Sequence, residues 1–383
     1  ARGPYKIVER SDWSRYDNGR YVGHVYREVR ASILPGTNQD AGFPASGPDT
    51  LWYRGNFFVL EETLRDMRQS AQAVDAVIPV SFGITGKGEL KIEEDQGFPS
   101  LRGFPVFPPE PVTAGVKWTA PGNRAVDPLN EGQPVTVPLI AEYEYRGVEL
   151  YRDVPVHRIF AKYASRYQQS GSGFNRLQGI HEVDILIRVS DGIPLLMRDN
   201  LDETYAWPNG TEVRFRGFTL TFGEGIVPLD RNSLVLSIER VLKPEPSPSA
   251  GRGTDPALAA AGIELAAVDE GLRLTLKDAR FYPDSDEFLP AEHPRLDRIA
   301  QALKQIPHRT FLVEGHTAAV GYAAGEMELS LKRAKRMVDE LVKRGISPDR
   351  FIYKGWGGTK PLGDNGNEAG RAQNRRVEIT ILE

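Results

Sequence analysis

The chain has 383 residues, a formal net charge of −4 at pH 7 and no cysteine. This length exceeds one ordinary hydrophobic core and predicts more than one domain. No segment concentrates Lys and Arg as phosphate binding requires, so we expect no nucleic acid among the partners. No apolar run reaches the roughly 18 residues of a membrane-spanning helix. The lack of cysteine excludes disulfides and cysteine-ligated zinc, and we expect neither a metal nor a cofactor.

The first part of the chain is rich in aromatic residues and turns. Tyr21–Leu34 and Leu51–Leu60 carry the Val, Ile, Tyr and Phe residues that are typical of strands. Gly86 and Gly88 mark a hairpin turn. Phe104–Pro111 contains several prolines in close succession, which fit neither a central strand nor a helix interior. We therefore predict a β-rich domain over residues 1–110.

The middle of the chain shows clearer strand patterns. Apolar residues alternate with polar ones over 137–145 and again over 183–189. Arg146-Gly147, Asp191-Gly192 and Pro208-Asn-Gly210 supply turns, of which the last two are strong hairpin signals. The pattern predicts an antiparallel β sandwich or barrel-like domain over residues 111–242.

The composition changes at residue 243. Prolines, glycines and serines dominate Lys243–Thr254, which predicts a linker over residues 243–260. Beyond it strand and helix signals alternate, with strands at 272–276, 310–314, 351–356 and 377–382 and helices at 296–306 and 329–344. The pattern predicts an α/β sandwich over residues 261–383, a mixed sheet with helices on one face, and a multidomain α+β chain as a whole.

Three blocks near the end of the chain are distinctive. They are Gly315-His-Thr-Ala-Ala-Val-Gly321, Leu329-Ser-Leu-Lys-Arg-Ala334 and Asn374-Arg-Arg-Val-Glu-Ile379. Gly345-Ile346 and Gly370-Arg371 lie between the second and third blocks. In order and spacing this resembles the C-terminal, peptidoglycan-binding domain of the OmpA-like (outer membrane protein A) family. The resemblance covers residues 261–383 and implies the family's mixed-sheet fold; we recognise no family in the residues before them.

The resemblance also implies a ligand site, at Phe281, Thr317, Ala318, Glu326 and Arg333. In the family an Asp on the loop and an Arg on the helix hold the ammonium and the carboxylate of diaminopimelate in the peptidoglycan stem peptide. The Arg position is Arg333, but Ala318 stands where the family usually has Asp. Half of the charge pair is missing, so we expect weak or lost peptidoglycan binding.

Glu326 stands where the family usually has Asn. About two helical turns separate it from Arg333, so both should face the same side of a continuous helix. Glu326 would then either neutralise Arg333, which we favour, or replace the missing acid and keep a functional peptidoglycan anchor. The first alternative is expected because buried arginines are normally paired.

We predict a non-enzymatic, structural protein of the bacterial cell envelope, in the periplasm and associated with the outer membrane of a Gram-negative or spirochaete-like cell. It would help to organise the envelope, with other envelope proteins as possible partners; some relatives are lipoproteins, whose modified cysteine would precede this sequence. We assign no catalytic residue. His24, His157, His181, His293 and His308 show no metal-binding spacing, and we interpret them as solvated or capped. An enzyme in the β-rich region is the alternative, which a cleft with convergent titratable groups would favour.

Overall fold

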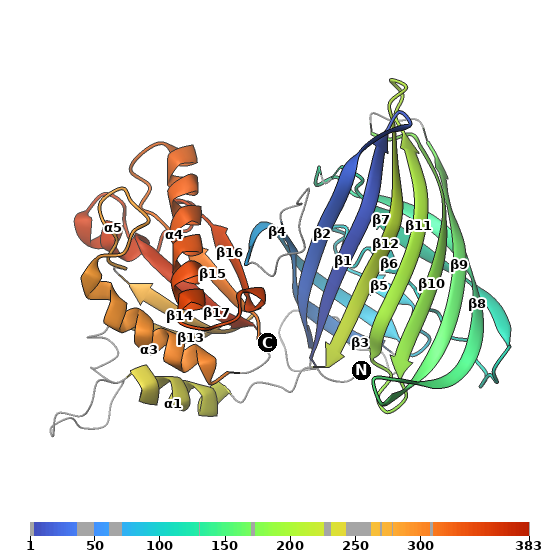
Figure 1. Cartoon of the computed structure of the whole chain (residues 1–383), viewed down its shortest axis with the longest axis horizontal. Helices are drawn as coiled ribbons and strands as arrows, with labels where there is room; N and C mark the ends of the chain where they lie inside the picture. The colour runs from blue at the N-terminus through green and yellow to red at the C-terminus, as the bar shows by residue number, and fades with distance from the viewer. Residues whose placement is uncertain are drawn as a thin grey trace. The chain divides into compact units, whose positions relative to one another are not determined.

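The computed structural model describes residues 4–36, 50–60, 71–129, 131–169, 173–225, 231–242, 262–268, 270–277, 279–306 and 309–382. The chain divides into two compact units, Ala1–Asp66 with Ala76–Val227 and Met67–Asp75 with Pro228–Glu383. We call them the N-terminal unit and the C-terminal unit. In Figure 1 the first runs from blue to yellow-green and the second is mainly yellow to red.

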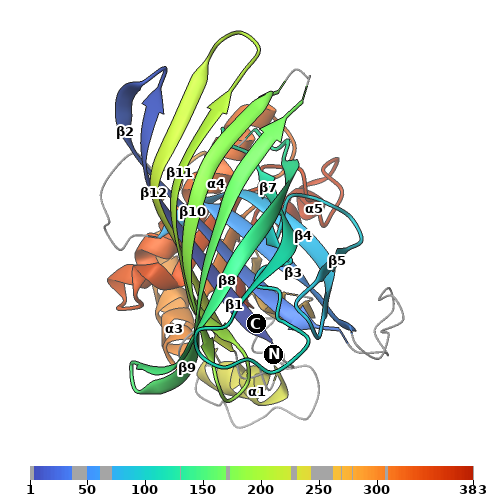
Figure 2. The same cartoon turned by 90° about the vertical axis from the view of Figure 1, so that its right-hand side faces the viewer.

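The N-terminal unit is built from long antiparallel strands, which curl in Figures 1 and 2. Their bounds are β1 (Tyr5–Asp17), β2 (Arg20–Pro35), β3 (Thr50–Leu60), β4 (Gln72–Thr85), β5 (Leu90–Ile92), β6 (Leu101–Arg102), β7 (Lys117–Val126), β8 (Val135–Tyr151), β9 (Val154–Gln168), β10 (Arg176–Arg188), β11 (Pro194–Ala206) and β12 (Glu212–Gly225). Strand β1 pairs with β2 on one side and with β12 on the other. From β12 the pairing continues back through β11, β10, β9, β8 and β7 to β6.

This pairing differs from the predicted division at residues 110 and 111. Strand β6, before the proline cluster, pairs with β7 after it, and Tyr5 in β1 lies opposite Gly225 in β12. The prolines at 104–111 occupy the connection between β6 and β7, where they disturb no ladder. The two predicted β-rich domains are therefore one unit.

The predicted turn at Arg146-Gly147 is also absent. Both residues lie inside β8, where the register against β9 shifts between Tyr145 and Gly147. Gly147 has φ 101, a backbone conformation that a β-bulge readily places on glycine. The chain instead turns at Arg152 and Asp153, before β9.

The inner face of this sheet carries a band of charged and polar side chains between two apolar clusters. One cluster contains Leu139, Val183 and Ile185, and the other contains Leu177 and Leu201. The alternation of strand residues explains the band, because every second side chain points to the same face.

Glu203 is the centre of this band and is 1% exposed. Its carboxylate accepts two hydrogen bonds from Arg124, at 2.6 and 2.9 Å, and one from the Tyr205 hydroxyl at 2.8 Å. His181 Nε2 lies 2.8 Å from Glu203, and its Nδ1 lies 2.9 Å from Asp199. A Cβ at Gly179 would lie 2.5 Å from Glu203 Cγ, so the glycine leaves room for this side chain.

Burial opposes the ionisation of Glu203, but Arg124 and His181 outweigh it and hold its pKa well below the ordinary value. Burial also disfavours charged His181, yet its hydrogen bonds to Asp199 and Glu203 raise its pKa. The shifts of the two pKa values each favour the charged form, and the two groups pair with each other.

The C-terminal unit contains a five-stranded mixed sheet. Its strands are β13 (Ile263–Val268), β14 (Gly271–Lys277), β15 (Phe311–Gly315), β16 (Phe351–Gly355) and β17 (Arg376–Leu382). They pair in the order β13–β14–β17–β15–β16, with only β15 and β16 parallel to each other. Gln72 and Ala73, at the start of β4, pair in parallel with β16 and belong to this unit.

The helices of the C-terminal unit are α1 (Arg231–Leu242), α3 (His293–Lys304), α4 (Ala323–Lys343) and α5 (Glu368–Asn374), with 3₁₀ turns at Pro290–Glu292 and Pro348–Arg350. Helix α4 packs against β15 and β16, and α1 packs against α3. Ile238 and Leu242 of α1 are buried in the same core cluster as Leu296. The sequence interpretation had placed this helix in the preceding β-rich domain. The predicted linker at 243–260 lies outside the described residues.

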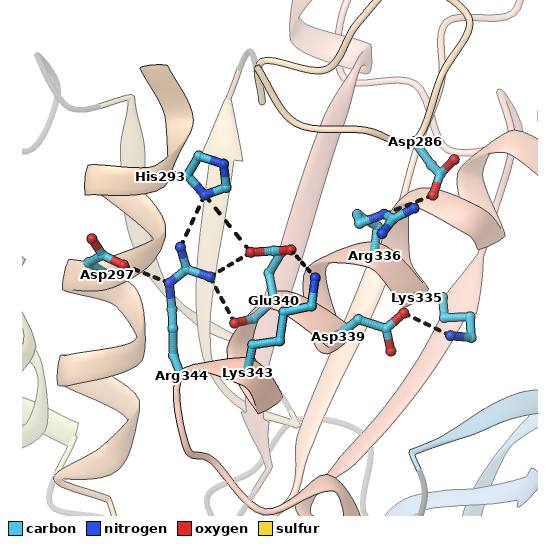
Figure 3. Close-up of polar contacts among 9 residues, drawn as sticks. All are labelled: Asp286, His293, Asp297, Lys335, Arg336, Asp339, Glu340, Lys343 and Arg344. Carbon is cyan, nitrogen blue, oxygen red and sulfur yellow. Dashed lines mark hydrogen bonds and ion pairs between the residues drawn. The ribbon is translucent and has the colours of Figure 1, made fainter. Parts of the chain in front are cut away.

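Ion pairs also connect α4 to its neighbours (Figure 3). Arg344 donates to Asp297 of α3 at 2.7 Å and to Glu340 at 2.7 Å. Arg336 donates to Asp286, in the segment before α3, at 3.0 Å. These pairs fix α4 against the segment that precedes and includes α3.

The backbone of α4 lies directly on the ends of β15 and β16. A Cβ at Gly315 would lie 2.1 Å from the carbonyl oxygen of Ser330, and one at Gly355 would lie 2.5 Å from the amide nitrogen of Leu331. Only glycine permits this approach.

We predict that Gly315→Ala destabilises the C-terminal unit by about 1–3 kcal/mol, because the methyl group must push α4 from β15. Gly325→Ala is the control: no atom lies within 4 Å of its added Cβ, and alanine favours the helix by about 0.5–1 kcal/mol. Amide hydrogen exchange in β15 and β16 measures both changes. Equal protection in the two variants would contradict the close approach.

We also predict that Glu203→Gln destabilises the N-terminal unit by about 3–5 kcal/mol, because Arg124 and His181 lose their buried carboxylate. Asp202→Asn, at the neighbouring position with a surface partner in Arg214, should cost less than about 1 kcal/mol. Hydrogen exchange in β10 and β11 measures the difference.

The same variant tests pH dependence. The folded-state pKa of Glu203 is depressed, so its contribution is present above the ordinary pKa of 4.5 and is lost as the pH falls below it. The unaltered chain should therefore lose more stability than Glu203→Gln between pH 6 and pH 3. Parallel acid profiles would show that Glu203 is not the titrating group.

Candidate functional site

The candidate site surrounds the loop that follows β15. Neighbouring segments fix the backbone of this loop. The Thr317 N–H donates to Gly357 O at 3.0 Å, and the Ala319 N–H donates to Asn365 Oδ1 at 3.0 Å. These bonds hold residues 316–322 as a defined loop before α4 begins at Ala323.

Asn374, at the end of α5, supports this loop from behind and is fully buried. Its Oδ1 accepts from the N–H groups of Leu362 and Gly363, at 2.7 and 2.8 Å. Its Nδ2 donates to Asn365 Oδ1 at 2.8 Å, and the same oxygen accepts from Ala319. A chain of amides thus connects the sequence block at 374–379 to the loop, which gives Asn374 a positioning role.

Arg333 projects from α4 and is 8% exposed. Its Nε donates to the carbonyl oxygen of Ser285 at 3.0 Å, and its Cζ lies 4.7 Å from the ring centroid of Phe281. Phe281 stacks in turn on Phe288 at 4.3 Å. Two of the predicted site residues, Phe281 and Arg333, are therefore in contact.

No carboxylate forms an ion pair with Arg333 among the residues that the structure describes. Burial lowers its pKa, Asp284 opposes that shift, and Arg375 adds to it. Asp286 is already paired with Arg336 (Figure 3). The guanidinium is thus a buried cation held by a carbonyl group and an aromatic face, and its remaining N–H groups suit a carboxylate ligand.

Ala318 lies on the loop and is 5% exposed, so it offers only a methyl group at the position of the family's acid. Thr317 beside it is 6% exposed, and its hydroxyl has no hydrogen-bond partner in the described part of the chain. The loop therefore contributes no negative charge at these two positions.

Glu326 does not pair with Arg333. Its Oε1 accepts hydrogen bonds from the N–H groups of Val320 and Gly321, at 2.8 and 2.6 Å. The helical spacing predicts only that both residues lie on one face of the helix. The Glu326 carboxylate instead turns back to the loop before α4, where it binds the N–H groups of Val320 and Gly321. Glu326 stabilises the loop instead.

His316 lies next to these residues and is 1% exposed. Its Nε2 lies 3.6 Å from Glu378 Oε2, and burial lowers its pKa. Glu378 accepts a hydrogen bond from Arg376 at 2.7 Å, and its pKa is lowered to about 2 despite its burial. This arrangement supports the strand ends.

The N-terminal unit contains a second group of convergent titratable side chains, which the sequence interpretation missed. His181, interpreted as solvated or capped, is 1% exposed and lies between Asp199 and Glu203. The available signal was the alternation: His181 shares its face of β10 with Val183, and Glu203 shares its face of β11 with Leu201. Charged residues at such inward positions mark a buried network.

In the described residues, no helix has both the length and the hydropathy needed to cross a membrane. Within the same ranges, no three His, Asp or Glu side chains are arranged to hold a metal ion.

Comparison with known proteins matches residues 280–375 to the OmpA family. Outer membrane porin F of Pseudomonas fluorescens is 38% identical over 104 residues, 27% of this chain and 32% of that protein. The peptidoglycan-binding protein ArfA of Mycobacterium tuberculosis is 37% identical over 101 residues, 26% of this chain and 31% of that protein. An outer membrane protein of Borrelia burgdorferi, of known structure, is 35% identical and covers 32% of this chain and 99% of its own, with a TM-score of 0.28.

The chain spans about a third of the length of these two curated relatives. The matched region lies in the C-terminal unit and contains Phe281, the loop after β15, α4 with Arg333, and the 374–375 end of α5. Residues 280–375 of this chain are therefore a domain of the OmpA family.

Proposed function

We propose that this chain is a non-enzymatic, peptidoglycan-associated protein of the bacterial cell envelope whose OmpA domain binds the stem peptide weakly. The observation that carries the proposal is the state of Arg333, a buried guanidinium with no acid opposite it at Ala318. The relatives support the association with the envelope, since one is named a peptidoglycan-binding protein and others are outer membrane proteins.

The site keeps one half of a two-charge clamp. Arg333 can receive a carboxylate, but Ala318 cannot accept a hydrogen bond from an ammonium group. Losing one charge-assisted hydrogen bond in a partly desolvated site costs on the order of 1.5–3 kcal/mol, or about tenfold to a hundredfold in affinity. A zwitterion such as diaminopimelate therefore gains little from its ammonium group here.

A functional anchor that uses Glu326 is less well supported, because this carboxylate is already bonded to two loop N–H groups. Asp284 is the better alternative acid. It is the carboxylate with the strongest attraction for Arg333, and it occupies a left-handed backbone conformation with φ 50 on the loop before α3. Asp284→Asn therefore accompanies the experiments below.

The proposal of a structural, non-enzymatic role also rests on the titratable side chains of the N-terminal unit. In the N-terminal unit the convergent groups Arg124, His181 and Glu203 bond to one another, and among the residues that the structure describes none of the three forms a hydrogen bond with a Ser or Thr hydroxyl. We infer a scaffold or spacer in the periplasm, associated with the outer membrane, that presents its OmpA domain to the cell wall and contacts other envelope proteins.

We predict that Ala318→Asp increases binding to purified sacculi by about tenfold to a hundredfold, because it restores an acid at the family's spacing from Arg333. Co-sedimentation of the full chain with sacculi measures the gain. Val320→Asp is the matched control: it adds the same charge to the same loop at a side chain that is 68% exposed.

The gain must also depend on the other half of the clamp. Combining Ala318→Asp with Arg333→Gln should return binding to the level of the unaltered chain, while a thermal melt confirms that each variant is folded. Strong sedimentation of the unaltered chain would reject the weakened site, and its loss in Asp284→Asn would assign the acid to Asp284.

A further inference from the structure

One edge of β16 in the C-terminal unit is covered by a strand from a distant part of the chain. Strand β16 pairs with β15 on one side, and on the other side Ile352 and Tyr353 pair in parallel with Gln72 and Ala73. The OmpA match begins at residue 280, so this added strand comes from outside the matched residues. Its described ladder has two residue pairs, whereas β16 has five residues. The added strand is therefore a short cover on a sheet edge.

The added strand contacts the domain through small apolar side chains. Ala73 is 5% exposed and belongs to the core cluster that the helices cover, and Ala71 packs against the same cluster. Successive side chains of a strand point to opposite faces of the sheet, so Val74 faces away from this core. Val74 is buried as well. The edge thus accommodates an extended segment with residues of alanine size at alternate positions.

Lys354 holds the backbone of the same segment. Its ammonium group donates to the carbonyl oxygens of Val74 and Asp75, at 3.2 and 2.7 Å. The ammonium also lies 5.3 Å from the ring centroid of Trp356, whose indole N–H donates to Glu314 at 2.6 Å. This bond fixes the ring, which helps to place the cation. Because every residue has a carbonyl group, Lys354 recognises an extended backbone and not a particular side chain.

The segment on this edge is the beginning of a longer strand. Met67–Asp75 belongs to the C-terminal unit, whereas β4 continues from Ala76 in the N-terminal unit. Main-chain pairing combined with space for alternate side chains is how sheet edges bind extended peptides. A segment on the same chain has an effective concentration in the millimolar range, so it excludes a free peptide of equal affinity.

We propose that the β16 edge of the OmpA domain is a docking site for an extended segment of a partner protein, with residues of alanine size at alternate positions. Residues 71–75 of this chain occupy the site until the partner exchanges with them. The exchange releases the beginning of β4 from the C-terminal unit. This site shares no residue with the one at Arg333, and the proposal does not depend on peptidoglycan binding.

A synthetic peptide of residues 71–77, labelled at its N-terminus, is the probe, and fluorescence anisotropy with the full chain measures its binding. The unaltered chain should bind it weakly, because its own segment covers the edge. In the chain, Ala73→Glu places a charge in the core and withdraws this segment, so peptide binding should increase by at least about tenfold. The same substitution in the peptide should abolish binding to this variant.

The contribution of Lys354 is tested in the Ala73→Glu chain. Adding Lys354→Met should weaken peptide binding by about tenfold, because a charge-assisted hydrogen bond to the backbone is lost. Lys360→Met is the matched control. Lys360 is exposed and its ammonium lies 3.5 Å from the centroid of the same Trp356 ring, so its loss should leave peptide binding unchanged.

Gln72→Pro is a second way to open the edge. Proline is disfavoured within a paired strand, and this substitution leaves Ala73 unchanged. Melting curves identify an unfolded variant, in which case the other variant decides. Failure of the peptide to bind a folded open variant, equal binding of the peptide that carries Ala73→Glu, or unchanged affinity in Lys354→Met would each overturn the proposal. Dimers of the open variants that excess peptide does not dissociate would also overturn it and assign the edge to a second copy of the chain.

Discussion

The contact between the α4 backbone and the ends of β15 and β16 determines the geometry of the OmpA domain. Because Gly315 and Gly355 present no side chain, Ser330 and Leu331 lie against the strands, and Arg333 follows within the same turn of α4. The loop after β15 is connected to this contact through Gly357, whose N–H donates to Ser330 Oγ at 2.8 Å and whose carbonyl oxygen accepts from the Thr317 N–H at 3.0 Å. The place of Arg333 is thus a property of the scaffold, and it does not depend on a side chain at position 318.

The two units differ in whether their buried charged side chains have a partner of opposite charge. In the N-terminal unit, Arg124 and His181 share the carboxylate of Glu203, and His181 also contacts Asp199. In the C-terminal unit, Arg333 is almost as deeply buried but has a carbonyl and a ring in place of an acid. A paired network rigidifies its surroundings, whereas a buried charge without a counterion costs stability and is typical of ligand sites.

The sequence predicts local structure well where patterns are short in range. The alternation in β8 and β10 and the periodicity of α3 are confirmed, and the motif blocks identified the OmpA domain at 280–375. The pairing of β1 with β12 could not be predicted from the sequence, because a local pattern of residues does not indicate which distant strand lies beside a given strand. Likewise, helical spacing placed Glu326 and Arg333 on one face, but the N–H groups of Val320 and Gly321 determined where the Glu326 side chain points.

The position of β1 also has a consequence for how the chain folds. Ser11 in β1 contacts Thr219 in β12, the last strand of the N-terminal unit, which lies 208 residues later in the chain. The ladder between β1 and β12 runs from Tyr5–Gly225 to Asp17–Val213. During synthesis β1 can pair with β2 at once, but its other edge stays open until β12 has been made. Such distant pairings slow folding, because a long loop must close before the contacts form. An open strand edge also invites pairing with other chains, so a chaperone that covers β1 would be most useful before the last strand arrives.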